Sequence, residues 1–270
     1  MLGSNLPEIT EMVRYILYSD YVVLDGSHKE TPLSAMIVAP PEHGKTAVVE
    51  QFNPNNGILH MTNVTAYGLQ KQYFAEMQKG NIKRILVPDF VNPANKKQDT
   101  INSTVTFFNS YISWEGVGSI ATYAMTIRVK DTVKGALLTT MATEDFKRMR
   151  KSLAAVGFLS RMLVISYRYS REKADEILKS IVTRRAPWSK VELQFPDGKV
   201  SVNLPGTLAL ELMPTAKRLG ESAHGIGLRG ANQLMMMAKC RALSEGRDVV
   251  TKEDINRVLY LCNEYVGEVK

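Results

Sequence analysis

The chain has 270 residues and a mass of 30.2 kDa, enough for one α/β domain with a smaller satellite. Charged residues make up 23% and hydrophobic residues 44%, a balance that excludes disordered and fibrous proteins, and two cysteines are too few for a disulfide framework. Lys and Arg outnumber Asp and Glu by 34 to 27. The resulting charge of +7 permits a polyanionic partner without requiring one.

The cysteines and the first residues indicate the compartment. Cys240 and Cys262 lie among apolar residues with helical spacing, which is typical of buried thiols, and no Cys or His spacing suits a structural zinc site. The N-terminus lacks the charged-then-apolar order of a signal peptide, and no apolar run is long enough to cross a bilayer. We therefore expect a soluble, cytoplasmic protein without a membrane partner.

Apolar runs alternate with helical patterns along the first 170 residues. The patterns predict helices over 11–17, 46–52 and 67–78, an extended segment over 21–24, and strands over 35–38, 58–64, 84–87, 135–140 and 163–167. Continuous apolar strands that alternate with helices are typical of a parallel sheet covered on both faces. The expected fold class is therefore α/β.

The remainder of the chain has a different pattern. Two alternating runs, 191–195 and 199–203, flank a Pro-Asp-Gly turn and predict a β-hairpin. Beyond it, an apolar stripe over 231–242 and a helix that starts with Thr251 as its N-cap predict helical structure. We accordingly expect an α/β core over 1–182, a hairpin connector over 183–205 and a helical subdomain over 206–270.

A phosphate-binding loop follows the strand predicted at 35–38. The residues that we expect to hold a nucleotide there are Ala39, Pro40, Pro41, Glu42, His43, Gly44, Lys45, Thr46 and Ala47. They match the P-loop pattern, with Ala39 in place of the usual first glycine. Backbone N–H groups and the start of the following helix would cradle the phosphates, Lys45 would reach the β- and γ-phosphates, and the Thr46 hydroxyl would hold Mg²⁺. ATP and Mg²⁺ are the expected cofactors.

A second element of such a site is an acidic residue at the end of a neighbouring strand. Asp89 follows the apolar run 84–87 and is the expected second ligand of Mg²⁺. The next residue is Phe90, where ATPases of this kind carry a glutamate that activates water. Hydrolysis of ATP therefore lacks its usual base, although the P-loop still leads us to expect ATPase activity.

Two further motifs narrow the interpretation. Leu159-Ser160-Arg161 precedes the strand at 163–167, and Arg229 precedes an apolar helix that is followed by a Val-Thr-x-x-Asp-Ile helix start at 250–255. Together with the P-loop, these motifs resemble the AAA+ ATPase module over about residues 20–265, most closely its minichromosome-maintenance (MCM) helicase branch. The resemblance implies a helical lid over 206–270, an arginine finger at Arg161 and a sensor-2 arginine at Arg229. Thr139 or Thr140 would be the sensor that orients the attacking water.

The resemblance also implies partners. AAA+ proteins of this branch assemble as rings, usually hexamers, so we expect a homo-oligomer that acts on nucleic acid as a translocase or helicase. Residues 109–130 fall where the branch carries a hairpin that faces DNA, which makes Arg128 and Lys130 candidate phosphate contacts. Two alternatives stay open. One is a nucleotide-switched assembly protein with little turnover, and the other is a protein-remodelling ATPase of the MoxR kind.

Overall fold

A computed structural model describes residues 6–24, 31–52, 57–90, 98–121, 126–128, 131–184, 190–222, 227–267 and 269. Its centre is a five-stranded sheet with the strand order β2-β3-β6-β1-β7, in which all neighbouring strands are parallel. These strands are β1 (Ala35–Ala39), β2 (Ile58–His60), β3 (Arg84–Val87), β6 (Ala136–Ala142) and β7 (Leu163–Ser166). The parallel sheet predicted from the apolar runs is confirmed.

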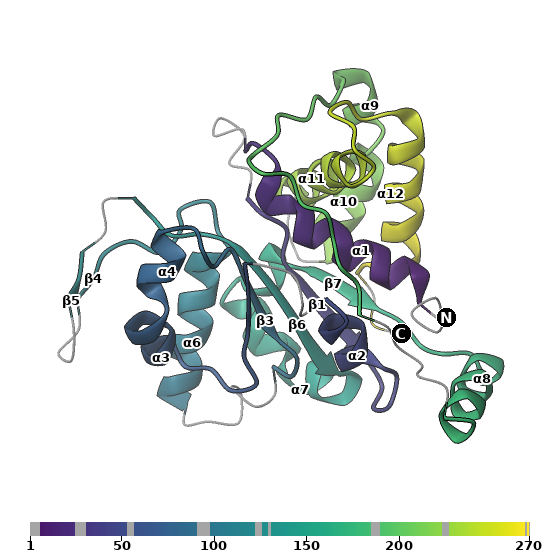
Figure 1. Cartoon of the computed structure of the whole chain (residues 1–270), viewed down its shortest axis with the longest axis horizontal. Helices are drawn as coiled ribbons and strands as arrows, with labels where there is room; N and C mark the ends of the chain where they lie inside the picture. The colour runs from purple at the N-terminus through teal and green to yellow at the C-terminus, as the bar shows by residue number, and fades with distance from the viewer. Residues whose placement is uncertain are drawn as a thin grey trace.

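Helices cover both faces of the sheet (Figure 1). One face carries α3 (Ala66–Gln72), α4 (Phe74–Gln78), α6 (Gln98–Tyr111) and α7 (Thr143–Ala155). The other face carries α1 (Pro7–Tyr18), α2 (Lys45–Glu50) and the C-terminal lid helices α9 (Gly206–Leu210), α10 (Met213–Ser222), α11 (Leu228–Ser244) and α12 (Lys252–Tyr265). Helix α8 (Arg171–Val182) projects from the body, as does the antiparallel pair β4 (Ile120–Ala121) and β5 (Thr126–Ile127). No helix in the described ranges is long and apolar enough to cross a membrane.

Strand β1 separates two hydrophobic cores because successive side chains of a strand point to opposite faces. Ala35, Ile37 and Ala39 pack on the side of α1, α2 and the lid, whereas Met36 and Val38 pack on the side of α3, α4, α6 and α7. All five residues are fully buried. The continuous apolar run that predicted this strand thus reflects burial on both faces.

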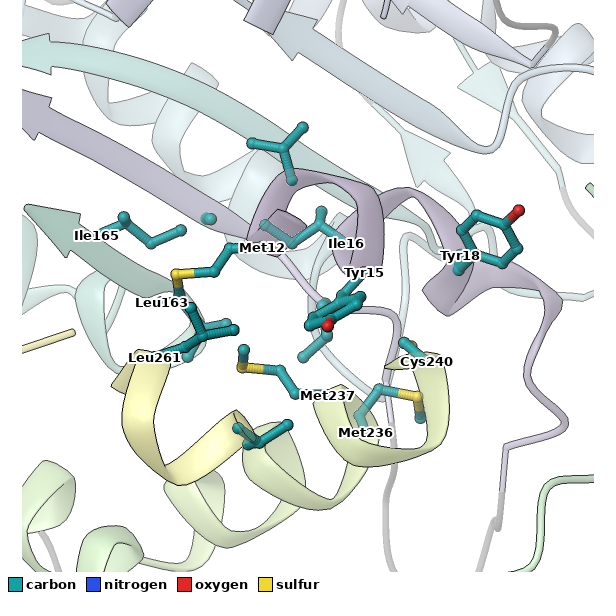
Figure 2. Close-up of a cluster of buried hydrophobic side chains, with 14 of the residues drawn as sticks. Met12, Tyr15, Ile16, Tyr18, Leu163, Ile165, Met236, Met237, Cys240 and Leu261 are labelled. Atoms are coloured by element: carbon teal, nitrogen blue, oxygen red, sulfur yellow. The ribbon is translucent and has the colours of Figure 1, made fainter. Parts of the chain in front are cut away.

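Helix α1 joins the sheet to the lid. Its side chains meet strand β7 on one side and the lid helices on the other, as Figure 2 shows for Met12, Tyr15, Ile16, Leu163, Ile165, Met236, Met237, Cys240 and Leu261. All of these residues are at most 1% exposed. The expectation that both cysteines are buried is confirmed, and Met236 and Met237 are buried beside them.

The hairpin predicted over 191–203 is wrong. No strand lies in residues 190–205, and their backbone groups bond to distant segments instead. The N–H of Val191 donates to Gln51 O at 2.7 Å, that of Val200 to Tyr21 O at 2.7 Å, and that of Asn203 to Asp248 O at 2.8 Å. Phe195 stacks on Tyr21 with the ring centroids 4.8 Å apart. The segment is an extended strap across α1 and the lid, and the boundaries at 182 and 205 stay predictions.

Two smaller expectations also need correction. The strand predicted over 58–64 ends at His60, so Asn63 lies in an exposed loop. The helix predicted over 67–78 is interrupted at Tyr73, whose φ of −121° is not helical, and becomes α3 and α4. Neither change moves an element of the sheet.

Asp254 ties the lid helices together. Its side chain is fully buried and accepts hydrogen bonds from Arg241, from Arg247 at 2.7 Å and from the N–H and hydroxyl of Thr251, which closes the capping box of α12. Burial raises the pKa of this carboxyl group, but the bonds from Arg247, Thr251 and Arg241 outweigh it and hold the pKa well below its ordinary value. The charge of Asp254 therefore stabilises the fold.

We predict that Asp254→Asn lowers the free energy of unfolding in urea by about 2–3 kcal/mol, because Arg241 and Arg247 lose their buried counter-charge. The stabilisation is complete above the unfolded pKa of about 4 and is lost as pH falls through the lower folded pKa, so the gap to the wild type should shrink below about pH 4. Glu253→Gln is the control, because Glu253 is 82% exposed and should change the stability by less than about 0.5 kcal/mol. Equal effects of the two changes would contradict the assignment.

Candidate functional site

The P-loop lies at the carboxyl end of β1 and leads directly into α2. Glu42 and Gly44 have φ angles of 62° and 70°, so the loop turns twice through the left-handed region before the helix starts at Lys45. Glycine adopts this conformation without strain, which explains Gly44. The Lys45 ammonium donates to Pro40 O at 2.8 Å and thus lies over the loop that it is expected to serve.

Two tyrosines at the end of β7 contact the P-loop. The Tyr167 hydroxyl donates to His43 O at 2.6 Å, and the His43 ring stacks on Tyr169 with the centroids 4.9 Å apart. The His43 Nδ1 also lies 2.8 Å from Pro41 O. Because β7 pairs with β1 along its length, these contacts fix the P-loop to its own sheet. Sequence reasoning missed both tyrosines, since their role depends on strand order.

Two carboxylates act on Lys45. Burial lowers the pKa of Lys45, whereas the negative charges of Asp89 and Asp145 raise it. Asp89 follows β3 as predicted and is exposed, as is Thr46. A hydroxyl and a carboxylate at this edge are the hard oxygen ligands that Mg²⁺ prefers, so the residues present fit the expected ion.

Asp145 was not predicted, and its position follows from the sheet register. Ala142, the last residue of β6, pairs with Ala39, the last residue of β1, so the first turn of α7 starts beside the P-loop. That turn contains Thr143 and Asp145. The Thr143 hydroxyl is buried and has no hydrogen-bond partner among the described residues, which leaves a polar atom available at this edge.

The residue after Asp89 points away from the site. Phe90 is 1% exposed and packs in an aromatic cluster, with its ring centroid 5.4 Å from that of Phe158 and 6.4 Å from that of Phe108. Its N–H donates to Thr140 O at 2.9 Å, which anchors the turn to β6. The carboxylate that other ATPases place here is thus replaced by a core side chain.

Thr139 and Thr140 face β3 rather than the P-loop. The Thr139 hydroxyl donates to Val87 O at 2.8 Å, and the Thr140 hydroxyl donates to Pro88 O. Both side chains are at most 2% exposed. Each hydroxyl has one proton to donate. Here both protons are used in hydrogen bonds between β6 and the end of β3. Thr143, the first residue of α7 directly after the same strand, lies nearer to the P-loop edge.

Arg161 lies at the opposite edge of the sheet. It ends the 3-10 turn η4 (Leu159–Arg161) just before Leu163, which pairs with Ala35, the first residue of β1. Five residues of β1 therefore separate Arg161 from the P-loop, roughly 15 Å at the rise of a strand. The Arg161 guanidinium donates to Gly157 O at 2.7 Å.

Arg229 lies beside Arg161, on the first turn of α11, where its guanidinium donates to the Ser160 hydroxyl. Burial and the charge of Arg229 lower the pKa of Arg161, and the charge of Glu115 opposes them. The structure thus brings the two predicted arginines together, and it brings Lys45, Thr46 and Asp89 together elsewhere. The predicted site is thus divided into two halves at opposite edges of the sheet of one chain.

The hairpin expected within 109–130 is present as β4 and β5, between α6 and β6. Arg128 directly follows β5 and is exposed, whereas Lys130 lies outside the described residues. The loop that leads from α6 to the hairpin contains Glu115, whose pKa is lowered by a hydrogen bond from Ser113 and by the charges of Arg161 and Arg229. The loop that precedes the hairpin thus passes close to the arginine pair.

Comparison with known protein families bears on the C-terminal helices. A family model of the AAA lid domain matches residues 221–263, which include α11 and most of α12. No curated protein matches the chain. The lid match, the parallel sheet and the helices on both of its faces show an AAA+ α/β fold with a C-terminal helical lid, and they fit an AAA+ ATPase module.

Proposed function

We propose that the protein is an ATP-binding AAA+ module that assembles head to tail into a ring, expected to be a hexamer, and acts on nucleic acid in the manner of the MCM branch. The observation that carries the proposal is the separation of the P-loop and the arginine pair on opposite edges of one parallel sheet. A site with both halves needs two copies of the chain. Repeated head-to-tail contacts close into rings or extend into filaments.

Each half has a defined role in this proposal. Backbone N–H groups of residues 42–47, which lie beyond the two prolines of the loop, and the Lys45 ammonium would bind the phosphates. Mg²⁺ held by Thr46 and Asp89 would neutralise charge on the phosphate oxygens. Arg161 and Arg229 of the neighbouring copy supply two cations at the edge where charge develops in the transition state. We assign both arginines to the neighbour's nucleotide.

Asp145 is our candidate for the base that Phe90 does not supply. Asp145 lies at the P-loop edge, where its negative charge raises the pKa of Lys45. Its side chain is 31% exposed, so water can reach it. It pairs with Arg148 at 2.8 Å, an i,i+3 contact that orients the carboxylate without burying it. Thr143, rather than Thr140, is our candidate for the sensor beside it.

The nucleic-acid part of the proposal rests on the β4–β5 pair, the exposed Arg128 and the excess of positive charge. Some of that excess belongs to the nucleotide half-sites, since Lys45, Arg161 and Arg229 face ATP. A second function, a nucleotide-switched assembly or remodelling protein of the MoxR kind with little turnover, is favoured by Phe90 being a core residue.

We predict that Arg161→Ala and Lys45→Ala chains are each inactive in ATP hydrolysis, with Arg161→Ala losing about a thousandfold or more in kcat but still binding ATP. A 1:1 mixture should recover about a quarter of the wild-type rate, since roughly one interface in four then joins an intact P-loop to an intact arginine. The control is a mixture of Lys45→Ala with the double variant Lys45→Ala/Arg161→Ala. This mixture should recover no ATPase activity, because none of its chains has an intact P-loop. No recovery in the first mixture would contradict a shared site.

Asp145→Asn should lower kcat by about a hundredfold or more while leaving ATP affinity within about threefold, because a general base acts in the chemical step. Glu144→Gln is the matched control, since the adjacent Glu144 is 79% exposed and pairs only with Lys147 among the described residues. Single-turnover hydrolysis and binding of a fluorescent ATP analogue measure the two quantities. A wild-type chain that assembles with ATP but does not hydrolyse it would support the switch function instead.

If the protein acts on nucleic acid, single-stranded DNA should raise its ATPase rate, and DNA binding should weaken steeply with salt. Arg128→Ala should weaken binding uniformly across sequences and reduce the salt slope by about one. Fluorescence anisotropy over a salt series measures both effects, with Lys179→Ala, an exposed cation on α8, as the control. Binding that ignores salt would count against phosphate contacts.

A further inference from the structure

A cavity lies beside β7, the last strand in the order of the sheet, between α7 and the lid. Its lining comes from α7, from residues 159–164, from α10 and α11, and from the residues that follow α12. We call it the lid cavity. Its volume of about 690 Å³ lies within the range of small-molecule pockets, roughly 300–1,000 Å³. No P-loop residue is among its described lining residues.

The walls of the lid cavity are apolar. They include Phe146 from α7, Leu159, Met162 and Val164 beside or in β7, and Leu219 and Leu228 from the lid. Leu228 is 69% exposed, so part of this apolar surface is open to water. An apolar molecule that covered it would gain free energy from the hydrophobic effect.

Close packing fixes the walls of the lid cavity. A Cβ atom at Gly227 or Gly230 would lie 2.6 or 3.1 Å from Ala216 O, so the start of α11 lies against the backbone of α10. On the side of the sheet, the Gly267 N–H donates to Val164 O at 3.2 Å. The cavity is therefore preformed, as most small-molecule sites are.

The rim of the lid cavity is basic. Arg150 and Lys151 of α7 and Arg229 of α11 line it, and no carboxylate is among its described lining residues. The two cations that precede Arg150 on α7 each pair with a carboxylate three residues earlier, but no acidic residue lies three or four positions from Arg150 or Lys151. Glu115 acts on Arg229 from outside the cavity. Cations that gather in this way repel one another and favour an anion.

The apolar walls and the basic rim together select a class of ligand. A molecule with an apolar body and one anionic group would bury the body between α7 and the lid and place its charge at the rim. A neutral apolar molecule would gain nothing from the cations. ATP with Mg²⁺ does not suit the cavity, because no described carboxylate lines it to hold the metal.

We propose that the lid cavity binds a small, soluble amphipathic anion, such as a medium-chain carboxylate. Its apolar body lies between α7 and the lid, and its anionic group lies at Arg150, Lys151 and Arg229. Binding needs one chain only and does not rest on the proposed ring or on nucleotide. Because α7 packs on the sheet and α10 and α11 belong to the lid, the bound molecule holds these two parts together.

The test compares two fluorescent probes that share one ring system. The first, 1-anilinonaphthalene-8-sulfonate, carries an anionic group, and the second, N-phenyl-1-naphthylamine, is neutral. Arg150→Gln/Lys151→Gln should lower the affinity for the sulfonate about five- to tenfold but leave the affinity for the neutral probe within about twofold. Equal effects on the two probes, or no effect on either, would overturn the proposal.

Two further variants locate the binding. Arg171→Gln/Lys179→Gln removes the same two charges from α8, a helix whose apolar side chains are also exposed, and should bind both probes as the wild type does. Ala154→Trp changes an exposed residue that lines the cavity, and it should weaken the binding of both probes because the indole fills the space. Weaker binding by the α8 variant, or unchanged binding by Ala154→Trp, would place the probes elsewhere and contradict the assignment.

Competition separates this cavity from the nucleotide site. Octanoate should displace the sulfonate probe more effectively than 1-octanol at the same concentration, because only octanoate carries a charge. Lys45→Ala should bind the probe as the wild type does, since the P-loop lies at the other end of β7. This variant tests the cavity even if the proposed ATP-dependent function fails. Displacement of the probe from Lys45→Ala by ATP and Mg²⁺ would identify a nucleotide subsite and overturn the proposal.

Discussion

The common direction of the five strands decides where every functional group can lie. Residues that follow a strand gather at one edge of the sheet, and residues that precede a strand gather at the other. The P-loop, Asp89, Thr143 and the start of α8 belong to the first group, and Arg161 belongs to the second. The core on both faces of β1 makes this division rigid, since neither face can move without exposing buried side chains.

The P-loop edge departs from the usual AAA+ pattern at Ala39 and, with a larger effect on the chemistry, at Phe90. Phe90 completes an aromatic cluster beneath the sheet, so its replacement by glutamate would bury a charge among apolar rings. The carboxylates that remain at this edge come from Asp89 and from the first turn of α7. Parallel strands end at the same edge of the sheet. A carboxylate at the end of one strand can therefore take the place of a carboxylate at the end of its neighbour and still face the same phosphate.

Much of the fold could be predicted because it depends on local patterns: the strand over 35–38, the P-loop and the Thr251 cap each need only a few neighbouring residues. The hairpin over 191–203 failed because alternation indicates an extended chain but not its partner, and here the partners are distant. Arg161 and Arg229 are neighbours because of the way the lid packs on the sheet, and no local sequence pattern predicts that packing. Thr143 and Asp145 belong to no sequence motif, and their position beside the P-loop follows only from the register of β6 with β1.

Helix α1 gives the subunit a mechanical property. Its side chains are shared between the sheet and the lid, so the two parts have one continuous apolar core rather than two cores with a hinge between them. A rotation of the lid against the sheet would have to open that core around Met12 and Ile16. In the proposed ring, changes of nucleotide state would therefore be accommodated between copies rather than within one, and each chain would move together with its lid as a rigid body.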